Sequence, residues 1–263
     1  TSWKQMDRGN IKKEAVENSL LELKAIIDGI NDSGKEIEEI TICDSHGISE
    51  NISFTDFPEN VTLIRGFPRK YYMMEGLNDT YSGVFLIGYH APAGTKSGSM
   101  DHTYSASTVY SVKMNGRLAG EAELNGLLAA DYGVPVLLIS GDDKLFSFSS
   151  GNFKGLGTEF AITKESLGRY AIKAYHREGV LKELRSIAKK KVIEVDSIKP
   201  ITLDAPYEME IQLTDTLRGD LIETIPGFRR IDGRTVTYRD NSYKNVFRAL
   251  IAAVYMGIGA KHI

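Results

Sequence analysis

Apolar and polar residues follow one another along the chain in patterns that predict alternating helices and strands. Between about 10 and 30, apolar residues recur at helical spacing and charged residues fill the other face. This amphipathic helix ends at the breaker Asn31-Asp32-Ser33-Gly34. Short apolar runs predict buried strands at 38–43, 61–64, 84–87 and 134–139.

Further elements lie between and after these strands. Residues 108–118 predict a hairpin with a tight turn at Asn115-Gly116, and 120–132 and 178–190 predict helices. Because short apolar strands alternate with helices, we expect an α/β fold with a mostly parallel sheet and helices on both faces.

The pattern changes near 196–200, where we expect a boundary. After it come elements typical of a smaller α+β unit: strands at 207–213, near 228 and at 235–238, and helices at 214–222 and 242–256. The chain is therefore predicted to hold an α/β domain over 1–196 and a C-terminal α+β subdomain over 197–263. A parallel unit normally places a strand before its first helix, so we expect a strand upstream of Thr1.

Composition excludes some classes of partner. With 42% hydrophobic and 25% charged residues and a net charge of -3, the chain is typical of a globular protein. The basic run Lys189-Lys190-Lys191 reads as a solvated helix end, so no nucleic-acid partner is expected. No apolar run approaches the roughly 20 residues that span a membrane. Because Cys43 is the one cysteine, we expect a reducing, cytoplasmic location.

Two histidines follow predicted strands. His46 comes after the strand at 38–43, and His90 after the strand at 84–87. The carboxyl ends of strands form the ligand-binding edge of an open α/β sheet, so these side chains can converge. Glu121 adds a carboxylate, and imidazole with carboxylate suits zinc or a similar ion. The pattern alone leaves open that each is an ordinary loop histidine.

For other polar side chains the sequence leaves two possible roles, one functional and one structural. His102 lies in a glycine-rich loop and is a candidate general acid, base or nucleophile, or a surface histidine without a role. Asp142 and Asp143 follow a strand, where they either orient a histidine or cap the next helix. Cys43 reads as a strand residue rather than a nucleophile.

Nine short segments together carry a resemblance to one family. They are Asp44-Ser45-His46, Met74-Glu75-Gly76-Leu77, Gly88-Tyr89-His90-Ala91, Met100-Asp101-His102, Asn115-Gly116-Arg117, Gly120-Glu121, Leu124-Asn125, Val134-Pro135-Val136 and Gly141-Asp142-Asp143. In order and spacing they resemble the zinc D-aminopeptidases of dipeptide-transport operons (DppA-like metallopeptidases), clearly from about Arg8 to Lys144 and more loosely beyond.

The resemblance implies a site with two zinc ions. His46 matches a ligand of one ion, and His90 and Glu121 match ligands of the other. His102 matches a histidine at the catalytic centre, proposed as nucleophile or acid-base group. The family's remaining acidic ligands lie in an S-x-D-x-E-G motif on a first strand, which this sequence does not contain. We expect that motif upstream of Thr1, in agreement with the expected strand.

The resemblance also implies a substrate class and an assembly. It indicates hydrolysis of short peptides with an N-terminal D-residue, such as D-alanyl peptides, by a ring-shaped homo-oligomer. Two alternatives stay open at this point. In the first, the chain lacks the two acidic ligands and is a degenerate protein that binds peptides without cleaving them. In the second, it is a metal-dependent hydrolase on the same fold that acts on another small amide or on a phosphate.

Overall fold

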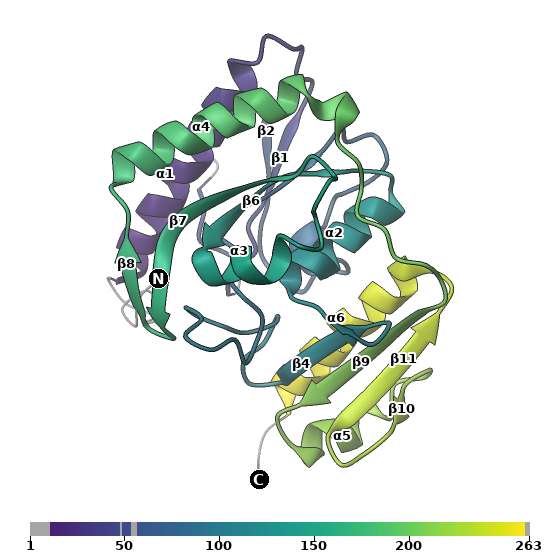
Figure 1. Ribbon diagram of the computed structural model, residues 1–263. Helices are drawn as coiled ribbons and strands as arrows, with labels where there is room; N and C mark the ends of the chain where they lie inside the picture. Colours follow the sequence, from purple (N-terminus) through teal and green to yellow (C-terminus); the bar gives the residue numbers. More distant parts are fainter. Residues whose placement is uncertain (1–10, 48, 54–56, 261–263) are drawn as a thin grey trace.

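The computed structural model describes residues 11–47, 49–53 and 57–260, and Figure 1 shows their arrangement. The helices follow the predicted amphipathic patterns, with one short helix between the predicted ones. They are α1 (Ile11–Asn31), α2 (Glu121–Asp131), α3 (Asp143–Ser149), α4 (Arg177–Ile193), α5 (Thr216–Ile222) and α6 (Tyr243–Gly259), with single 3-10 turns η3 (Tyr72–Met74) and η4 (Val195–Ser197).

The strands coincide with the predicted apolar runs, apart from one pair that has no such run. They are β1 (Ile40–Cys43), β2 (Val61–Ile64), β3 (Val84–Leu86), β4 (Val109–Met114), β5 (Arg117–Leu118), β6 (Val136–Asp142), β7 (Glu159–Gly168), β8 (Ala171–Ala174), β9 (Tyr207–Leu213), β10 (Arg229–Arg230) and β11 (Thr235–Asp240). The unpredicted pair is β7 and β8. Glu159, Lys164 and Glu165 interrupt the hydrophobicity of β7, so it has no apolar run.

The central sheet has the order β3-β6-β7-β8. β3, β6 and β7 run parallel, and β8 returns antiparallel to β7. β1 and β2 form a separate parallel pair. The expected α/β class is confirmed, and parallel pairing prevails in this part of the chain.

Helices cover both faces of the central sheet. On one face Leu138 of β6 packs in a cluster with Ile26 of α1 and Leu184 of α4, and Figure 1 shows these two helices together along one side. On the other face Ile139 belongs to the larger core with Leu145 of α3, where α2 also packs against β6. Adjacent residues of one strand thus face opposite helical layers, as in a buried parallel sheet.

A second sheet has the order β10-β11-β9-β4-β5 and is antiparallel. β9 pairs with β4, for example through Ile211 and Val112, so this sheet joins strands from both sides of the predicted boundary at 196/197. Helix α6 packs on it, with Phe247 and Leu250 buried. The division into 1–196 and 197–263 stays a prediction.

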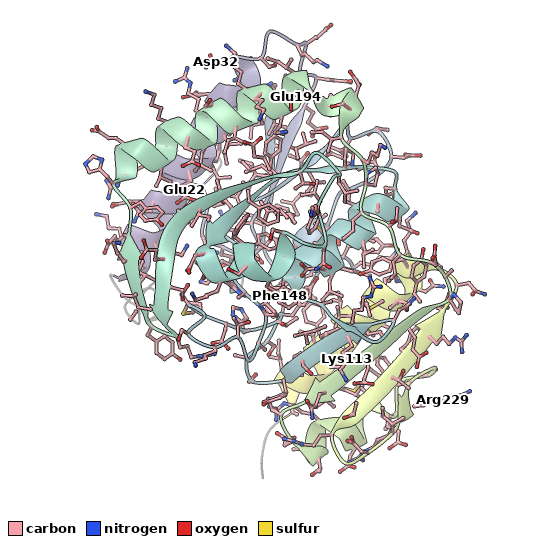
Figure 2. The ribbon with its side chains drawn as sticks, in the orientation of Figure 1. Glu22, Asp32, Lys113, Phe148, Glu194 and Arg229 are labelled. Atoms are coloured by element: carbon pink, nitrogen blue, oxygen red, sulfur yellow. The ribbon has the colours of Figure 1, made fainter. Side chains whose placement is uncertain are left out.

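The helices test two expectations from the sequence: that no segment spans a membrane, and that the basic run Lys189-Lys190-Lys191 is solvated. No helix in the described part of the chain is long and apolar enough to cross a membrane. The basic run at the end of α4 is only partly solvated: Lys189 and Lys190 are exposed, but Lys191 is buried. The Lys191 ammonium donates to Gly157 O at 2.9 Å and to the Glu194 carboxylate at 2.9 Å, and Figure 2 labels Glu194. The expectation of a solvated run is therefore wrong for Lys191, whose charge is paired inside the fold.

Candidate metal centre and active site

Three of the predicted site residues meet at one point. His90, His102 and Glu121 each offer a ligand atom, and these atoms lie within 4.8 Å of one another. The Nε2 of His90 is 3.7 Å from Glu121 Oε2, and the Nε2 of His102 is 3.9 Å from Glu121 Oε1. The two imidazoles stack with centroids 4.1 Å apart and planes 23° apart.

His90 is placed by the carboxyl end of β3. Tyr89 N donates to Ser140 O at 2.9 Å and Gly88 N donates to Ser140 Oγ at 3.0 Å, so contact with β6 continues beyond the strand. The Nδ1 of His90 is 3.0 Å from Ala91 O. Because a carbonyl oxygen can only accept a hydrogen bond, Nδ1 carries the hydrogen and Nε2 keeps its lone pair for a ligand role near Glu121.

Glu121 is the first residue of α2 and is buried at 4% exposure. Its Oε1 accepts a hydrogen bond from Tyr104 N at 2.7 Å. The partial positive charge at a helix N-terminus favours a carboxylate there. A buried carboxylate whose other oxygen faces an imidazole is a typical arrangement for a metal ligand.

The loop that carries His102 is tied to β6 and α3 through Asp142. Ser99 Oγ donates to Asp142 Oδ2 at 2.5 Å. The other carboxylate oxygen, Oδ1, caps α3 by accepting from Lys144 N at 2.9 Å and Leu145 N at 2.8 Å. The helix-cap reading of Asp142 is confirmed, and the same carboxylate also holds the loop.

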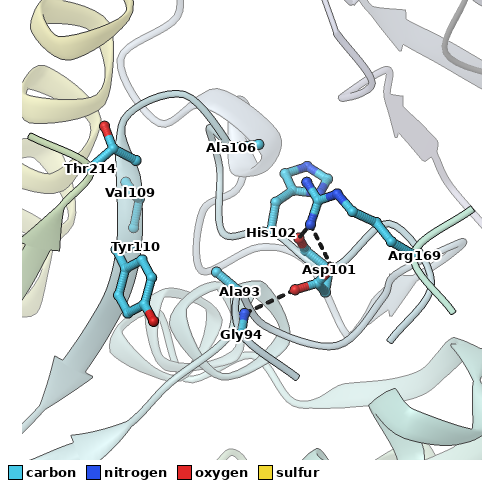
Figure 3. A pocket seen from close by; sticks show the side chains of 9 residues that line it. All are labelled: Ala93, Gly94, Asp101, His102, Ala106, Val109, Tyr110, Arg169 and Thr214. Carbon is cyan, nitrogen blue, oxygen red and sulfur yellow. Dashed lines mark hydrogen bonds and ion pairs between the residues drawn. The ribbon is translucent and has the colours of Figure 1, made fainter. Parts of the chain in front are cut away.

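A second tie comes from Arg169, in the turn between β7 and β8. Its Nη1 donates to Asp101 O at 2.6 Å and to Asp101 Oδ1 at 2.5 Å, as Figure 3 shows. Its own carbonyl accepts from Met100 N at 2.8 Å. Sequence reasoning missed Arg169, because nothing local relates it to a loop about 70 residues earlier in the chain.

The protonation state of His102 follows from its surroundings. Burial lowers its pKa below 6.5, the charge of His90 lowers it further, and Glu121 opposes both effects. The Nδ1 lies 2.5 Å from Met100 O and donates to it, which leaves Nε2 as the basic nitrogen. His102 is therefore neutral at neutral pH, the form that accepts a proton or a metal ion.

His46 lies apart from this cluster within the described residues. It is exposed, in the turn after β1, and its carbonyl accepts from Asn51 Nδ2 at 2.7 Å. Buried Asp44 shapes this turn by accepting from Asn51 N at 2.6 Å and Ile52 N at 2.9 Å. The Nη2 of Arg69 donates to Asp44 O at 2.7 Å. The ligand role of His46 stays a prediction.

Buried aromatic rings connect the His46 turn with the cluster. Tyr72 OH donates to Gly47 O at 3.3 Å, and its ring centroid is 5.9 Å from that of Tyr104, whose backbone binds Glu121. Burial, followed by the Glu121 charge, raises the pKa of Tyr72 to about 12. Tyr72 is therefore a neutral phenol at neutral pH and adds no charge between the turn and the cluster.

Cys43 has the role expected of a strand residue. Its Sγ accepts from Arg69 Nη1 at 3.3 Å, and its thiol donates to Tyr72 O at 3.5 Å. Burial raises the pKa of the thiol. A protonated thiol in this position is a poor nucleophile.

The donor set of the cluster fits a zinc ion. The imidazole nitrogen of His90 and the carboxylate of Glu121 are among the ligands that zinc prefers. Ligand atoms on a tetrahedral zinc lie roughly 3.4 Å apart, given bond lengths of about 2.0–2.1 Å. The 3.7 Å between His90 Nε2 and Glu121 Oε2 is close to that spacing.

A pocket of about 230 Å³ opens next to His102. It lies between the His102 loop, the β7–β8 turn and the start of β4 (Figure 3). Its lining residues are Ala93, Gly94, Asp101, His102, Ala106, Val109, Tyr110, Arg169 and Thr214.

Known proteins resemble this chain in sequence and in fold. The family Peptidase_M55, described as D-aminopeptidase, matches residues 1–252. A D-aminopeptidase of Bacillus subtilis (strain 168) is 27% identical over 217 residues, which are 81% of this chain and 77% of that protein. In fold, the chain matches the structure of the zinc-dependent D-aminopeptidase DppA from Bacillus subtilis, a self-compartmentalizing protease. The TM-score is 0.87 at 24% identity, over 99% of this chain and 93% of that one.

Proposed function

The chain belongs to the D-aminopeptidase family Peptidase_M55, and from this premise we propose that it is a zinc-dependent enzyme that removes N-terminal D-residues from short peptides. Membership confirms the expected enzyme class, an aminopeptidase that hydrolyses peptides. The observation that carries the zinc proposal is the convergence of His90, His102 and Glu121 within 4.8 Å.

In this proposal the ligand roles are divided between two ions. His90 and Glu121 hold one zinc ion, because each presents a free ligand atom to the other across 3.7 Å. His46 would hold the second ion, as its match to the family's ligand implies. When bound, zinc supplies Lewis-acid activation of the scissile carbonyl and of the attacking water. The zinc dependence of the Bacillus subtilis neighbour supports the choice of metal.

His102 moves the proton in this reaction. Its Nδ1 donates to Met100 O, so Nε2 is the atom that takes a proton from the attacking group. The same nitrogen then gives that proton to the leaving amine as the peptide bond breaks. The lowered pKa of His102 keeps the base in its neutral form before each turnover.

The proposal extends to the substrate and the assembly. The D-aminopeptidase names of the family and of the Bacillus subtilis relative support D-alanyl peptides as substrates. The self-compartmentalizing neighbour supports a homo-oligomer, which we propose to be ring-shaped. The cytoplasmic location expected from the single cysteine stays a prediction.

A stereochemical assay tests the proposed function. The full-length protein with zinc is incubated with D-Ala-D-Ala and, separately, with L-Ala-L-Ala, and free alanine is measured. We expect cleavage of the D-peptide with a kcat/KM at least about 100-fold above that of the L-peptide. This ratio corresponds to a difference of about 2.7 kcal/mol in transition-state binding between the two peptides. Equal cleavage of both would refute the D-specificity. Zinc binding without cleavage of either would favour a metal-dependent hydrolase of another substrate, and absence of bound zinc would favour the degenerate peptide-binding protein.

A further inference from the structure

We propose that Arg169 binds the free C-terminal carboxylate of the peptide substrate and so selects dipeptides and tripeptides over longer or amidated peptides. This proposal rests on the proposed function and deepens it by assigning the group that sets substrate length. It is carried by the Arg169 guanidinium, the pocket that this group shares with His102, and the small apolar wall opposite.

The guanidinium has donors left for a ligand. Arginine carries five N–H groups in a planar fork that matches a carboxylate. Arg169 uses Nη1 for both contacts with Asp101 and Nε for Tyr170 OH at 3.2 Å. Within the described part of the chain, its Nη2 makes no hydrogen bond, and the side chain is 38% exposed. Nη2 is therefore free to donate to a bound anion.

The fold holds this guanidinium in place. Asp101 pairs with Arg169 through Oδ1, and its Oδ2 accepts from Gly94 N at 2.9 Å. Met100 N donates to the Arg169 carbonyl, which fixes the turn against the His102 loop. A fixed guanidinium loses little side-chain entropy when it binds a carboxylate, so the interaction with the ligand is stronger.

The position of Arg169 and the size of the pocket fit a short peptide whose reacting end lies at His102. Arg169 and His102 line the same pocket, whose volume of about 230 Å³ is below the ~300–1,000 Å³ of pockets for drug-sized ligands. A peptide whose first residue lies at the cluster would extend its next one or two residues into this space. The pocket therefore fits the leaving part of a dipeptide or tripeptide.

The remaining wall suits a small side chain. Ala93, Ala106 and Val109 form an apolar surface, with Tyr110 at its edge (Figure 3). The acidic group in the pocket, Asp101, has both oxygens engaged by Arg169 and Gly94. A methyl group packs against the wall while the carboxylate turns to Arg169, which matches an alanine-type C-terminal residue.

The test compares an acid with its amide. Zinc-loaded full-length protein is assayed with D-Ala-D-Ala and with D-alanyl-D-alaninamide, which lacks the carboxylate charge. We expect the wild type to prefer the acid about 10- to 100-fold in kcat/KM, mainly through KM, as for a lost charge-assisted hydrogen bond. We expect Arg169→Gln to lose this preference, Arg169→Lys to keep part of it, and both to retain bound zinc.

Asp101→Asn is the matched control. It weakens the same ion pair and the same loop contact but leaves the guanidinium, so the preference for the acid should persist. The proposal is overturned if the wild type cleaves acid and amide equally well. It is also overturned if Arg169→Gln keeps the wild-type preference for the acid, because the guanidinium would then not bind the carboxylate.

A binding measurement distinguishes failure of the proposed peptidase activity from failure of the proposed carboxylate site. If the wild type holds zinc but cleaves neither peptide, binding of the two peptides is measured by calorimetry on the same protein. Binding of the acid at least about 10-fold tighter in the wild type, and not in Arg169→Gln, supports the carboxylate site without the reaction. Equal binding of acid and amide refutes it.

Discussion

Two stacked imidazoles and one buried carboxylate meet in the cluster of His90, His102 and Glu121. His90 and His102 lie 4.1 Å apart by ring centroid, so charging both would be costly, and Glu121 is within 4 Å of each. The sequence predicts His90 and Glu121 from their positions at the end of a strand and the start of a helix. It predicts His102 from its glycine-rich loop, and the family resemblance supports all three. It does not predict Arg169, because its contact with Asp101 depends on how two distant loops pack.

Replacement of His102 separates its proposed catalytic role from metal binding. We expect His102→Ala to keep its zinc and to lose about 10²- to 10⁴-fold in kcat, the usual contribution of a general acid-base group. Zinc is measured by elemental analysis and turnover with D-Ala-D-Ala. His90→Ala is the matched control and should lose the zinc ion that His90 shares with Glu121, together with activity. Loss of zinc in His102→Ala would instead make His102 a ligand, and normal turnover would remove it from the mechanism.

Secondary-structure elements deliver these side chains from separate parts of the chain. His90 follows β3 and Glu121 opens α2, both at positions that hydrophobic periodicity predicts. The His102 loop is held by Asp142 at the end of β6 and by the β7–β8 turn. Periodicity does not predict β7, because its charged residues pair with other elements once the chain is folded. The Lys190 contact with Glu159 is one such pair.

Ser99 provides a test of loop anchoring that leaves the helix cap intact. Ser99→Ala removes the hydrogen bond to buried Asp142 Oδ2, while Oδ1 still caps α3. We expect a loss of about 1–3 kcal/mol in the free energy of unfolding, measured by urea denaturation, together with lower turnover. Asp142→Ala removes both contacts and should cost more, since a lost cap adds about 0.5–2 kcal/mol. Wild-type stability and turnover in Ser99→Ala would contradict the anchoring role.

Glu159 makes the tie between β7 and α4 sensitive to acid. Burial tends to raise its pKa, but hydrogen bonds from Lys190 at 2.8 Å and from Lys191, with its ammonium at 3.3 Å, hold the pKa below 4.5. Because the folded pKa lies below the unfolded one, the ionised carboxylate stabilises the fold fully above about pH 4.5, and this contribution disappears as pH falls through the folded pKa.

We therefore expect Glu159→Gln to be less stable than the wild type at pH 7. The difference should be about 1 kcal/mol or less, since the carboxylate is partly exposed. It should shrink when urea denaturation of both proteins is repeated below about pH 4. A difference that stays constant with pH would show that packing, rather than charge, accounts for the effect of the substitution.

In the molecule as a whole, the two larger sheets are not built from successive segments of the chain. The β4–β5 hairpin follows the loop that carries His102, and its strand β4 pairs with β9. The C-terminal sheet is therefore built onto the strand that lines the pocket. Sequence patterns predict the elements of this sheet but not its pairing, because the partners are about 100 residues apart. The side chain of Tyr110 on β4 is exposed next to the pocket, at 55%.

The proposed homo-oligomer predicts the mass of the particle in solution. We expect light scattering to give several times the 29.1 kDa of one chain, at concentrations used for the assays. Such assemblies are usually closed by symmetry, so one sharp mass is expected rather than a broad distribution. A stable particle of about one chain mass would contradict this part of the proposal.

Zinc titration tests whether the cluster of His90, His102 and Glu121 is part of a catalytic metal centre. The full-length protein is stripped with EDTA, zinc is restored in steps, and bound zinc and D-alanine release from D-Ala-D-Ala are measured on the same samples. We expect no release without metal, and release that rises with bound zinc in the wild type. In His90→Ala we expect fewer bound zinc ions per chain than in the wild type and no restored release. Full activity after EDTA, or restored activity in His90→Ala, would contradict this expectation.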